Sequence, residues 1–221
     1  MPLLYDELFT CPNCNAVFQS KILGSYDTFG AGYSDLYIAS EQDPQPIIHM
    51  INTCPKCGFS AFTADYKSIV KDDLVKLEEA IKKVEKFTQK SAKDFNAGDG
   101  YLLISEYQKN ITAEQKSYTK MQACHAYRFL NDKNLEKTRE TVLRSVEGIL
   151  DEGVFQKNPQ ELYLYLAGEL NRILGFEEKA NNYYKKALEI AEKDSFVYRI
   201  TIHQLTNPNE IIPRIVFGKT H

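Results

Sequence analysis

Residues 161–194, ELYLYLAGELNRILGFEEKANNYYKKALEIAEKD, decide the fold of this chain. Large and small side chains recur in this stretch at helical spacing on both sides of Gly175, a residue type that commonly ends helices. Six positions of this stretch define its pattern. Before Gly175 they hold one large residue, Leu164, and two small ones, Ala167 and Gly168. After Gly175 they hold the small Ala180, the aromatic Tyr184 and the small Ala187. Small side chains allow two helices to cross closely. The stretch therefore predicts an antiparallel pair of helices.

This register matches the tetratricopeptide repeat, in which small residues mark the helix crossing and an aromatic fills the space between neighbouring repeats. Tyr184 holds that aromatic position. One repeat cannot bury its own apolar face, so further helices must stack on it. Residues 118–150 look like a degenerate copy whose small positions have drifted. We therefore expect a mainly α fold that contains an array of antiparallel helical hairpins.

Other helices are marked by their own signals. An apolar stripe predicts one long helix, ending before the stretch NAGDG at residues 96–100, which we interpret as a loop: Leu74, Leu77, Ile81, Val84, Phe87 and Ser91. Thr112 and Gln115 form a capping-box pattern ahead of the next helix. A helix is expected over 135–150, closed by Gly153. Asn158 is the expected N-cap of the following helix, with Pro159 at its first position.

Two Cys-Pro-x-Cys turns lie at the other end of the chain, at residues 11–14 and 54–57. Each turn can bring two sulfurs to one ion, and two such turns complete the closed tetrahedral shell that is typical of structural zinc. Gly58 and Asn15 follow the turns, where a left-handed backbone directs N–H groups toward the thiolates. The sequence therefore predicts structural Zn²⁺ bound by four residues: Cys11, Cys14, Cys54 and Cys57.

A redox pair, a disulfide and an iron site are the competing interpretations of these cysteines. A redox Cys-x-x-Cys should open a helix in a βαβ unit, whereas residues 16–18 are expected to form a strand that returns from a hairpin. Iron suits the same four sulfurs, and residue types alone do not separate it from zinc. The fifth cysteine, Cys124, lies in a helical pattern and is interpreted as a small buried hydrophobe.

The region between the two turns is long. Residues 24–46 are rich in Gly, Ser, Asp and aromatics and contain an expected short strand at 36–38, after which residues 47–52 are expected to form the strand that delivers Cys54. Phe18, Phe59 and Phe62 are the expected walls of a dry metal pocket. We therefore predict a zinc ribbon at 1–66 with a long insert, followed by a helical domain at 67–221.

Charge and hydropathy exclude several classes of protein. The net charge is −3, and residues 1–66 contain two basic residues against seven acidic ones. Because nucleic-acid affinity comes mainly from Lys and Arg that neutralise phosphates, we expect no nucleic-acid binding by this acidic ribbon. No stretch approaches the roughly 18 apolar residues of a membrane span, and no signal peptide is recognisable. With zinc-pattern cysteines, a reducing cytoplasm is the expected location.

The arrangement of motifs resembles a bacterial family of unknown function that joins a zinc ribbon to tetratricopeptide-like helices. The resemblance covers nearly the whole chain and includes YLAGELNRILG at 165–175. Its motif positions are Cys11, Pro12, Cys14, Pro46, Cys54, Pro55, Cys57, Gly58, Phe59, Gly168, Glu169, Leu170 and Gly175. The middle helices match only in pattern. The resemblance implies the fold and the metal, and it implies no activity.

Two classes of function stay open at this point. The first is a non-enzymatic adaptor whose helical repeats bind a protein or peptide through the inward face of one helix, with four predicted contact residues: Leu162, Tyr165, Glu169 and Arg172. The alternative packing for this face is a neighbouring helix or the apolar tail at 211–217. The second class is an enzyme with carboxylates of the insert, Asp27, Asp35 and Asp43, near the metal, although a closed four-sulfur shell leaves no place for an activated water.

Overall fold

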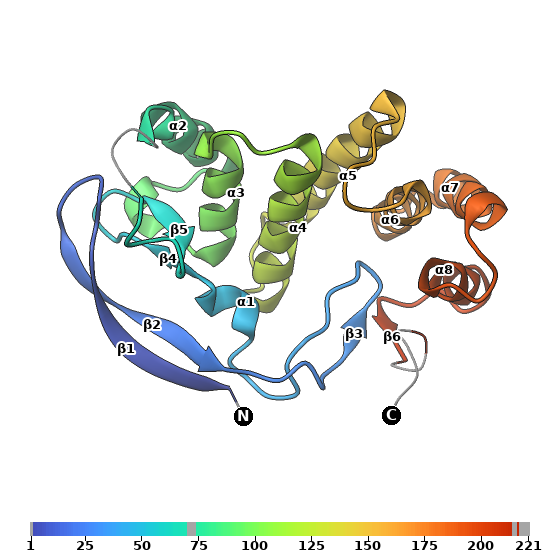
Figure 1. Ribbon diagram of the computed structural model, residues 1–221, viewed down its shortest axis with the longest axis horizontal. Helices are drawn as coiled ribbons and strands as arrows, with labels where there is room; N and C mark the ends of the chain where they lie inside the picture. The colour runs from blue at the N-terminus through green and yellow to red at the C-terminus, as the bar shows by residue number, and fades with distance from the viewer. Residues whose placement is uncertain (1, 70–73, 214–215, 217–221) are drawn as a thin grey trace. The chain divides into compact units, whose positions relative to one another are not determined.

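The structure of the protein is a computed structural model that describes residues 2–69, 74–213 and 216 (Figure 1). It is mainly α-helical with a small N-terminal antiparallel β part, which confirms the predicted fold class. The chain falls into two compact units: unit 1 contains Met1–Asp27 and Gln42–Thr138, and unit 2 contains Thr28–Glu41 and Arg139–His221. The units do not follow the predicted boundary after residue 66, because the ribbon and the first helices share unit 1. A separately folding ribbon stays a prediction.

Two antiparallel hairpins carry the cysteine turns of unit 1. In the first, β1 (Leu3–Thr10) pairs with β2 (Val17–Ser25), and Phe9 lies opposite Phe18. In the second, β4 (Ile51–Thr53) pairs with β5 (Ser60–Phe62). The predicted returning strand after the first turn is thus present as β2. Each hairpin ends in a tight turn, and each tight turn holds one pair of cysteines.

The strand predicted over 47–52 is wrong in its first half. Pro46 occupies the first turn of a short helix, α1 (Pro46–His49), and only the last part of the stretch continues as β4. Proline fixes φ near the helical value and lacks the N–H that a first-turn residue cannot use, so it favours a helix start. The apolar run at 47–48 is therefore helical although its composition suits a strand.

The first long helix is shorter than predicted. It is α2 (Leu77–Thr88), which ends where Gln89 adopts a left-handed backbone with φ 57°. Leu74 lies before this helix, and Ser91 lies after it and leads into a short 3-10 turn at Ala92–Asp94. A left-handed residue stops the helical ladder whatever the apolar stripe beyond it suggests.

The loop predicted at residues 96–100 is wrong, because this stretch opens helix α3 (Ala97–Tyr107). The Asn96 side chain accepts from the Asp99 N–H, and the Asp99 carboxylate accepts from the Asn96 N–H, which is a capping box. A Cβ on Gly98 would lie 2.3 Å from the ring of Tyr127. A Cβ on Gly100 would lie 2.6 Å from Ile51. The glycines permit close packing and do not form a turn.

Helix α4 (Ala113–Phe129) begins at the predicted capping box, in which Thr112 and Gln115 satisfy each other's backbone N–H groups. Beyond its end, Asp132 accepts from Lys90 Nζ at 2.6 Å, and the same ammonium donates to Asp99 at 2.9 Å. Tyr127 Oη also donates to Asp99, at 2.6 Å. This paired charge cluster joins the end of α2, the start of α3 and the end of α4.

Unit 2 is built mainly from four helices. Helix α5 (Leu135–Glu152) enters it at residue 139 and is followed by α6 (Gln160–Ile173), α7 (Glu177–Ile190) and α8 (Phe196–Thr206). Gly153 and Gly175 follow α5 and α6 with φ of 65° and 84°, as the sequence predicts. The predicted cap of α6 is one residue early: Pro159 is the N-cap, and the side chain of Asn158 donates instead to Tyr163 Oη.

The insert between the cysteine turns supplies the remaining part of unit 2. Its strand β3 (Gly32–Tyr33) pairs with β6 (Ile211–Ile212) from the C-terminal segment. The strand predicted at 36–38 is wrong: Leu36 has φ 71° and lies in a turn, and Ile38 forms an isolated bridge with Gly32. Arg214, Ile215 and Phe217 of the predicted apolar tail lie outside the described residues.

Candidate metal centre

The two cysteine turns have the same backbone hydrogen bonds. In the first, Asn15 N–H donates to Cys11 O at 2.9 Å, and Cys11 N–H donates to Ala16 O at 2.9 Å. In the second, Gly58 N–H donates to Cys54 O at 2.9 Å, and Cys54 N–H donates to Phe59 O at 2.8 Å. The predicted left-handed residues are both present, with φ 56° at Asn15 and 73° at Gly58. Each turn is thus a closed loop that holds its sulfurs on one side.

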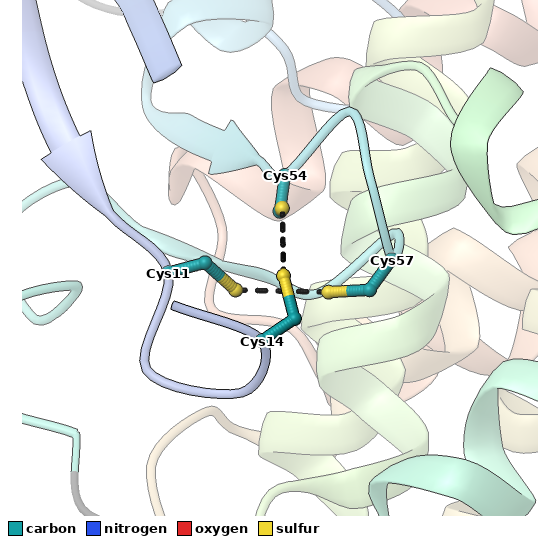
Figure 2. Close-up of side chains that lie close together, drawn as sticks. All are labelled: Cys11, Cys14, Cys54 and Cys57. Atoms are coloured by element: carbon teal, nitrogen blue, oxygen red, sulfur yellow. Dashed lines mark hydrogen bonds between the residues drawn. The ribbon is translucent and has the colours of Figure 1, made fainter. Parts of the chain in front are cut away.

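The four sulfurs meet at one point (Figure 2). Cys11 Sγ lies 3.6 Å from Cys57 Sγ, and Cys14 Sγ lies 3.7 Å from Cys54 Sγ. All four atoms lie within 4.8 Å of one another. A disulfide requires a separation of about 2.0 Å, so the cysteines are free thiols. Each close pair joins one turn to the other, and neither pair lies within a turn.

The spacing of the sulfurs fits a tetrahedral metal site. For a metal–sulfur distance of about 2.3 Å, the edge of a tetrahedron of sulfurs is about 3.8 Å. The two measured separations of 3.6 and 3.7 Å are close to that edge. The cluster can therefore hold a metal ion with four thiolates, and residues of both turns would hold it. A bound ion would cross-link the two turns. Because four sulfurs would fill its tetrahedral coordination shell, no coordination position would be left for a water.

Backbone N–H groups surround the sulfurs and favour thiolates. The hydrogen bond with Cys57 and burial raise the pKa of Cys11. The backbone N–H groups of Asn13 and Cys14 donate to Cys11 and act in the opposite direction, lowering its pKa. The N–H groups of Lys56 and Cys57 do the same for Cys54, whose pKa is raised by burial. The hydrogen bond from Cys11 lowers the pKa of Cys57. Donors fixed around a sulfur stabilise its charged form, which is the form that binds metal.

Aromatic rings pack together around Tyr66, close in sequence to the cysteine turns. Phe59 lies 5.2 Å from Tyr66 between ring centroids, and Phe9 and Phe18 pack on the same tyrosine at 5.2 and 6.0 Å. Phe18 and Phe59, two of the residues predicted to line the metal pocket, thus pack on Tyr66, while the third, Phe62, packs on Tyr101. The sequence analysis missed Tyr66 and Phe9. Phe9 precedes Cys11 by two residues, as Phe59 follows Cys57 by two, and that symmetry was the available signal for Phe9.

The three carboxylates considered for an enzyme are not members of the metal-ligating group that the described residues form at the cysteines. Asp35 is buried in unit 2, whereas Asp27 and Asp43 belong to unit 1. Within the described part of the chain, the potential metal cluster at these turns consists of cysteines alone. The arrangement therefore offers a binding shell of four sulfurs.

The four predicted partner-binding residues lie in the interior of unit 2 or at its edge. Tyr165 is fully buried, packs on Tyr184 at 5.9 Å and donates to Ser34 O at 2.7 Å. Glu169 is also fully buried, and Leu162 packs at the margin of the same core. Arg172 binds Glu169 through Nε and Nη2, at 3.0 and 2.6 Å. Tyr165 and Glu169 are thus buried and Arg172 is paired with Glu169, and the role of the four residues in binding a partner stays a prediction.

No helix among the described residues has both the length and the apolarity that a membrane crossing requires.

No curated protein and no solved structure matches the chain. A family model described as "Uncharacterized protein conserved in bacteria (DUF2225)" matches residues 4–204. Because the match covers most of the chain, including both cysteine turns and the α6–α7 pair, the protein belongs to the DUF2225 family.

Proposed function

We propose that the protein is a non-enzymatic adaptor, stabilised by one structural zinc ion, whose helical repeats bind a protein or peptide. The observation that carries the metal part is the closed shell of four sulfurs at tetrahedral spacing. Zinc is the commonest occupant of such a shell, and iron is the alternative with the same ligands. Elemental analysis of reduced protein tests the identity of the metal directly, because it separates zinc from iron.

The adaptor part is supported by the way in which α6 holds a turn of the insert, at residues 34–36. Tyr165 donates to the carbonyl of Ser34, and Ser34 N–H donates to Glu210 O at 2.9 Å. Leu36 packs against the core cluster that contains Tyr165. This face of α6 thus holds a peptide segment through one side-chain hydrogen bond to its backbone and through apolar packing. In the proposal, a partner presents such a segment to the face when residues 28–41 leave it.

The pairing of α6 with α7 supports a tetratricopeptide-like identity for this part of unit 2. Gly168 and Ala180 lie where the helices cross, and Tyr184 packs on Gly168. Arrays of such hairpins commonly bind peptides along the inner helices. We propose Leu162, Tyr165, Glu169 and Arg172 as the contact residues of that face.

A quantitative pull-down from bacterial extract tests the face. The baits are the unmodified protein, Tyr165→Phe and Arg172→Ala, with Arg144→Ala as the matched control, since Arg144 is an exposed arginine on helix α5 of the same unit. We expect a partner that both test variants lose and the control retains. Circular dichroism must show that each variant keeps its helices. A partner that all four baits retain equally contradicts binding at this face.

The proposal includes no nucleic acid. The ribbon region contains only Lys21 and Lys56 against seven acidic residues, and four thiolates on a divalent ion add about two negative charges. Residues 67–221 carry 25 basic and 23 acidic residues, a small positive excess. Binding to single- or double-stranded nucleic acid tighter than about micromolar at physiological salt would contradict this part.

A further inference from the structure

The hydroxyl of Tyr66 is the most unusual polar group near the cysteines. The side chain is 1% exposed, and its Oη lacks a hydrogen-bond partner among the described residues. A buried hydroxyl without a partner loses its hydrogen bond to water and gains none in return, which is unfavourable. Buried tyrosine hydroxyls normally find an acceptor, as Tyr101 and Tyr107 do with the carbonyls of Ile47 and Ser60. The Tyr66 hydroxyl is therefore a buried donor whose acceptor has to be identified.

The ring of Tyr66 is fixed in position by its neighbours. It is enclosed by three phenylalanine rings with centroids 5.2 to 6.0 Å away: Phe9, Phe18 and Phe59. The next residue, Lys67, forms an ion pair with Glu7 of β1 and lies 5.5 Å from the centroid of the Phe9 ring. These contacts hold Tyr66 between the two hairpins, so its hydroxyl has little freedom to find a different acceptor.

The groups that the hydroxyl faces are the sulfurs of the cluster. Its charged neighbours are Cys11, Cys54 and Cys57, and Cys11 is the strongest of them. Burial and these sulfurs raise the pKa of Tyr66 far above its usual range. Because the pKa of a tyrosine hydroxyl is ordinarily about 10, this hydroxyl carries its proton at neutral pH and acts as a donor toward a thiolate.

We infer that Tyr66 Oη donates a hydrogen bond to the sulfur of Cys11 when the cluster holds its metal ion, and that this bond strengthens metal binding. Four thiolates on a divalent ion carry a net charge of about −2, which donors to sulfur stabilise. The backbone N–H groups of Asn13 and Cys14 already serve Cys11, and Tyr66 adds a side-chain donor from a distant segment. This inference rests on the proposed occupation of the cluster by a metal ion.

The substitution Tyr66→Phe removes the hydroxyl and keeps the ring. Loss of a partner around metal ligands typically weakens metal affinity by 10–100-fold, and we expect a loss of about 10-fold here. In the Co²⁺-substituted protein, loss of a donor makes the sulfur lone pairs easier to oxidise. The sulfur-to-cobalt charge-transfer band should therefore move to lower energy.

The matched control is Tyr101→Phe. Tyr101 is a buried tyrosine of the same unit whose hydroxyl binds a backbone carbonyl, so the control removes the same atom without touching the sulfurs. The experiment titrates Zn²⁺ into the metal-free, reduced full-length proteins in competition with a chromophoric chelator. It then records the absorption spectrum of each Co²⁺ form.

Four results are distinguishable. If Tyr66→Phe alone loses affinity and shifts the band, the inference holds. If the unmodified protein and Tyr66→Phe bind with equal affinity and give identical bands, the inference is wrong while the metal site stands. If the unmodified protein binds no metal, the proposed metal centre itself is wrong, and the inference falls with it. A Tyr66→Phe protein that is unfolded even with metal present would also overturn the inference, because the hydroxyl would then serve the fold of the unit and not the affinity for metal.

Discussion

Gly168 of α6 lies directly against the ring of Tyr184 of α7. A Cβ placed on Gly168 would be 2.7 Å from two ring carbons of Tyr184 and 3.2 Å from the carbonyl oxygen of Ala180. The Tyr184 hydroxyl in turn donates to the buried Glu169 at 2.5 Å. The ring cannot turn away without losing that bond, so the closeness of the two helices depends on the missing side chain.

We predict that Gly168→Ala destabilises unit 2. Forcing a methyl group into a packed helix crossing typically costs about 1–3 kcal/mol of unfolding free energy. Gly148→Ala is the matched control, because it makes the same change in helix α5 where an added Cβ has no neighbour within 4 Å. That control should be neutral or stabilising by about 0.5–1 kcal/mol. Urea unfolding of both variants checks the opposite signs, and equal effects would contradict the packing argument.

Gly58→Ala should damage the second cysteine turn. Its φ of 73° is unfavourable for alanine, and the added Cβ would lie 2.7 Å from the Cβ and the carbonyl oxygen of Ala92. We expect faster loss of metal to a chelator. Asn15→Gly is the comparison, since glycine adopts the same left-handed backbone at the equivalent position of the first turn without strain. Retention of metal by Gly58→Ala equal to that of Asn15→Gly would show that the turn tolerates the side chain.

The charge cluster around Lys90 predicts a dependence of stability on acid pH. Burial raises the pKa of Asp132, but hydrogen bonds from Lys90, Asn134 and Asn96 outweigh burial and hold that pKa below its ordinary value of 3.8. The ionised carboxylate therefore contributes fully above about pH 4, and its contribution is lost as the pH falls through the lower folded-state value.

Asp132→Asn should consequently lower stability at pH 7, and its difference from the unmodified protein should shrink below pH 4. Urea unfolding at pH 7 and pH 3 measures both differences. Asp94→Asn is the control, because Asp94 is an exposed carboxylate of the same unit. A difference between Asp132→Asn and the unmodified protein that stays constant with pH would contradict the linkage.

Tyr165→Phe should loosen the insert in unit 2. It removes the hydrogen bond to Ser34 O and should cost about 0.5–1.5 kcal/mol. Amide hydrogen exchange at residues 33–36 should accelerate, most clearly at Ser34, whose N–H donates to Glu210 O. Tyr183→Phe removes a hydroxyl that binds Glu147 and should leave the exchange of the insert unchanged. Unaltered exchange in Tyr165→Phe would show that the hydrogen bond does not hold the insert.

The sequence predicts best those features in which short-range chemistry leaves little choice. Thr112 and Gln115 cap each other because both partners lie three residues apart. Gly58 and Asn15 take the left-handed backbone because the cysteine turn requires it. The four cysteines meet as predicted because two such turns are the usual pattern of one shared metal site. In these cases each residue interacts with residues close to it in sequence or, for the cysteines, with other cysteines.

The sequence fails where a residue's purpose is set by a distant partner. Gly98 and Gly100 resemble loop glycines, yet they admit Tyr127 and Ile51 at short distance. Tyr165 fits the binding face of a repeat, yet it is covered by the insert, more than a hundred residues away in sequence. Nothing in the sequence around Tyr66 indicates that it faces the cysteines. Such pairings depend on packing between segments, which local patterns do not encode.

The most direct test of the account is the metal content of the reduced protein, measured by elemental analysis alongside two cysteine variants. We predict one zinc ion per chain in the unmodified protein and in Cys124→Ser, because Cys124 is buried in α4 outside the cluster. Cys54→Ser should lose the ion, and its helical circular dichroism should be largely retained. The absence of stoichiometric zinc or iron from the unmodified protein, or undiminished metal in Cys54→Ser, would contradict the four-cysteine centre.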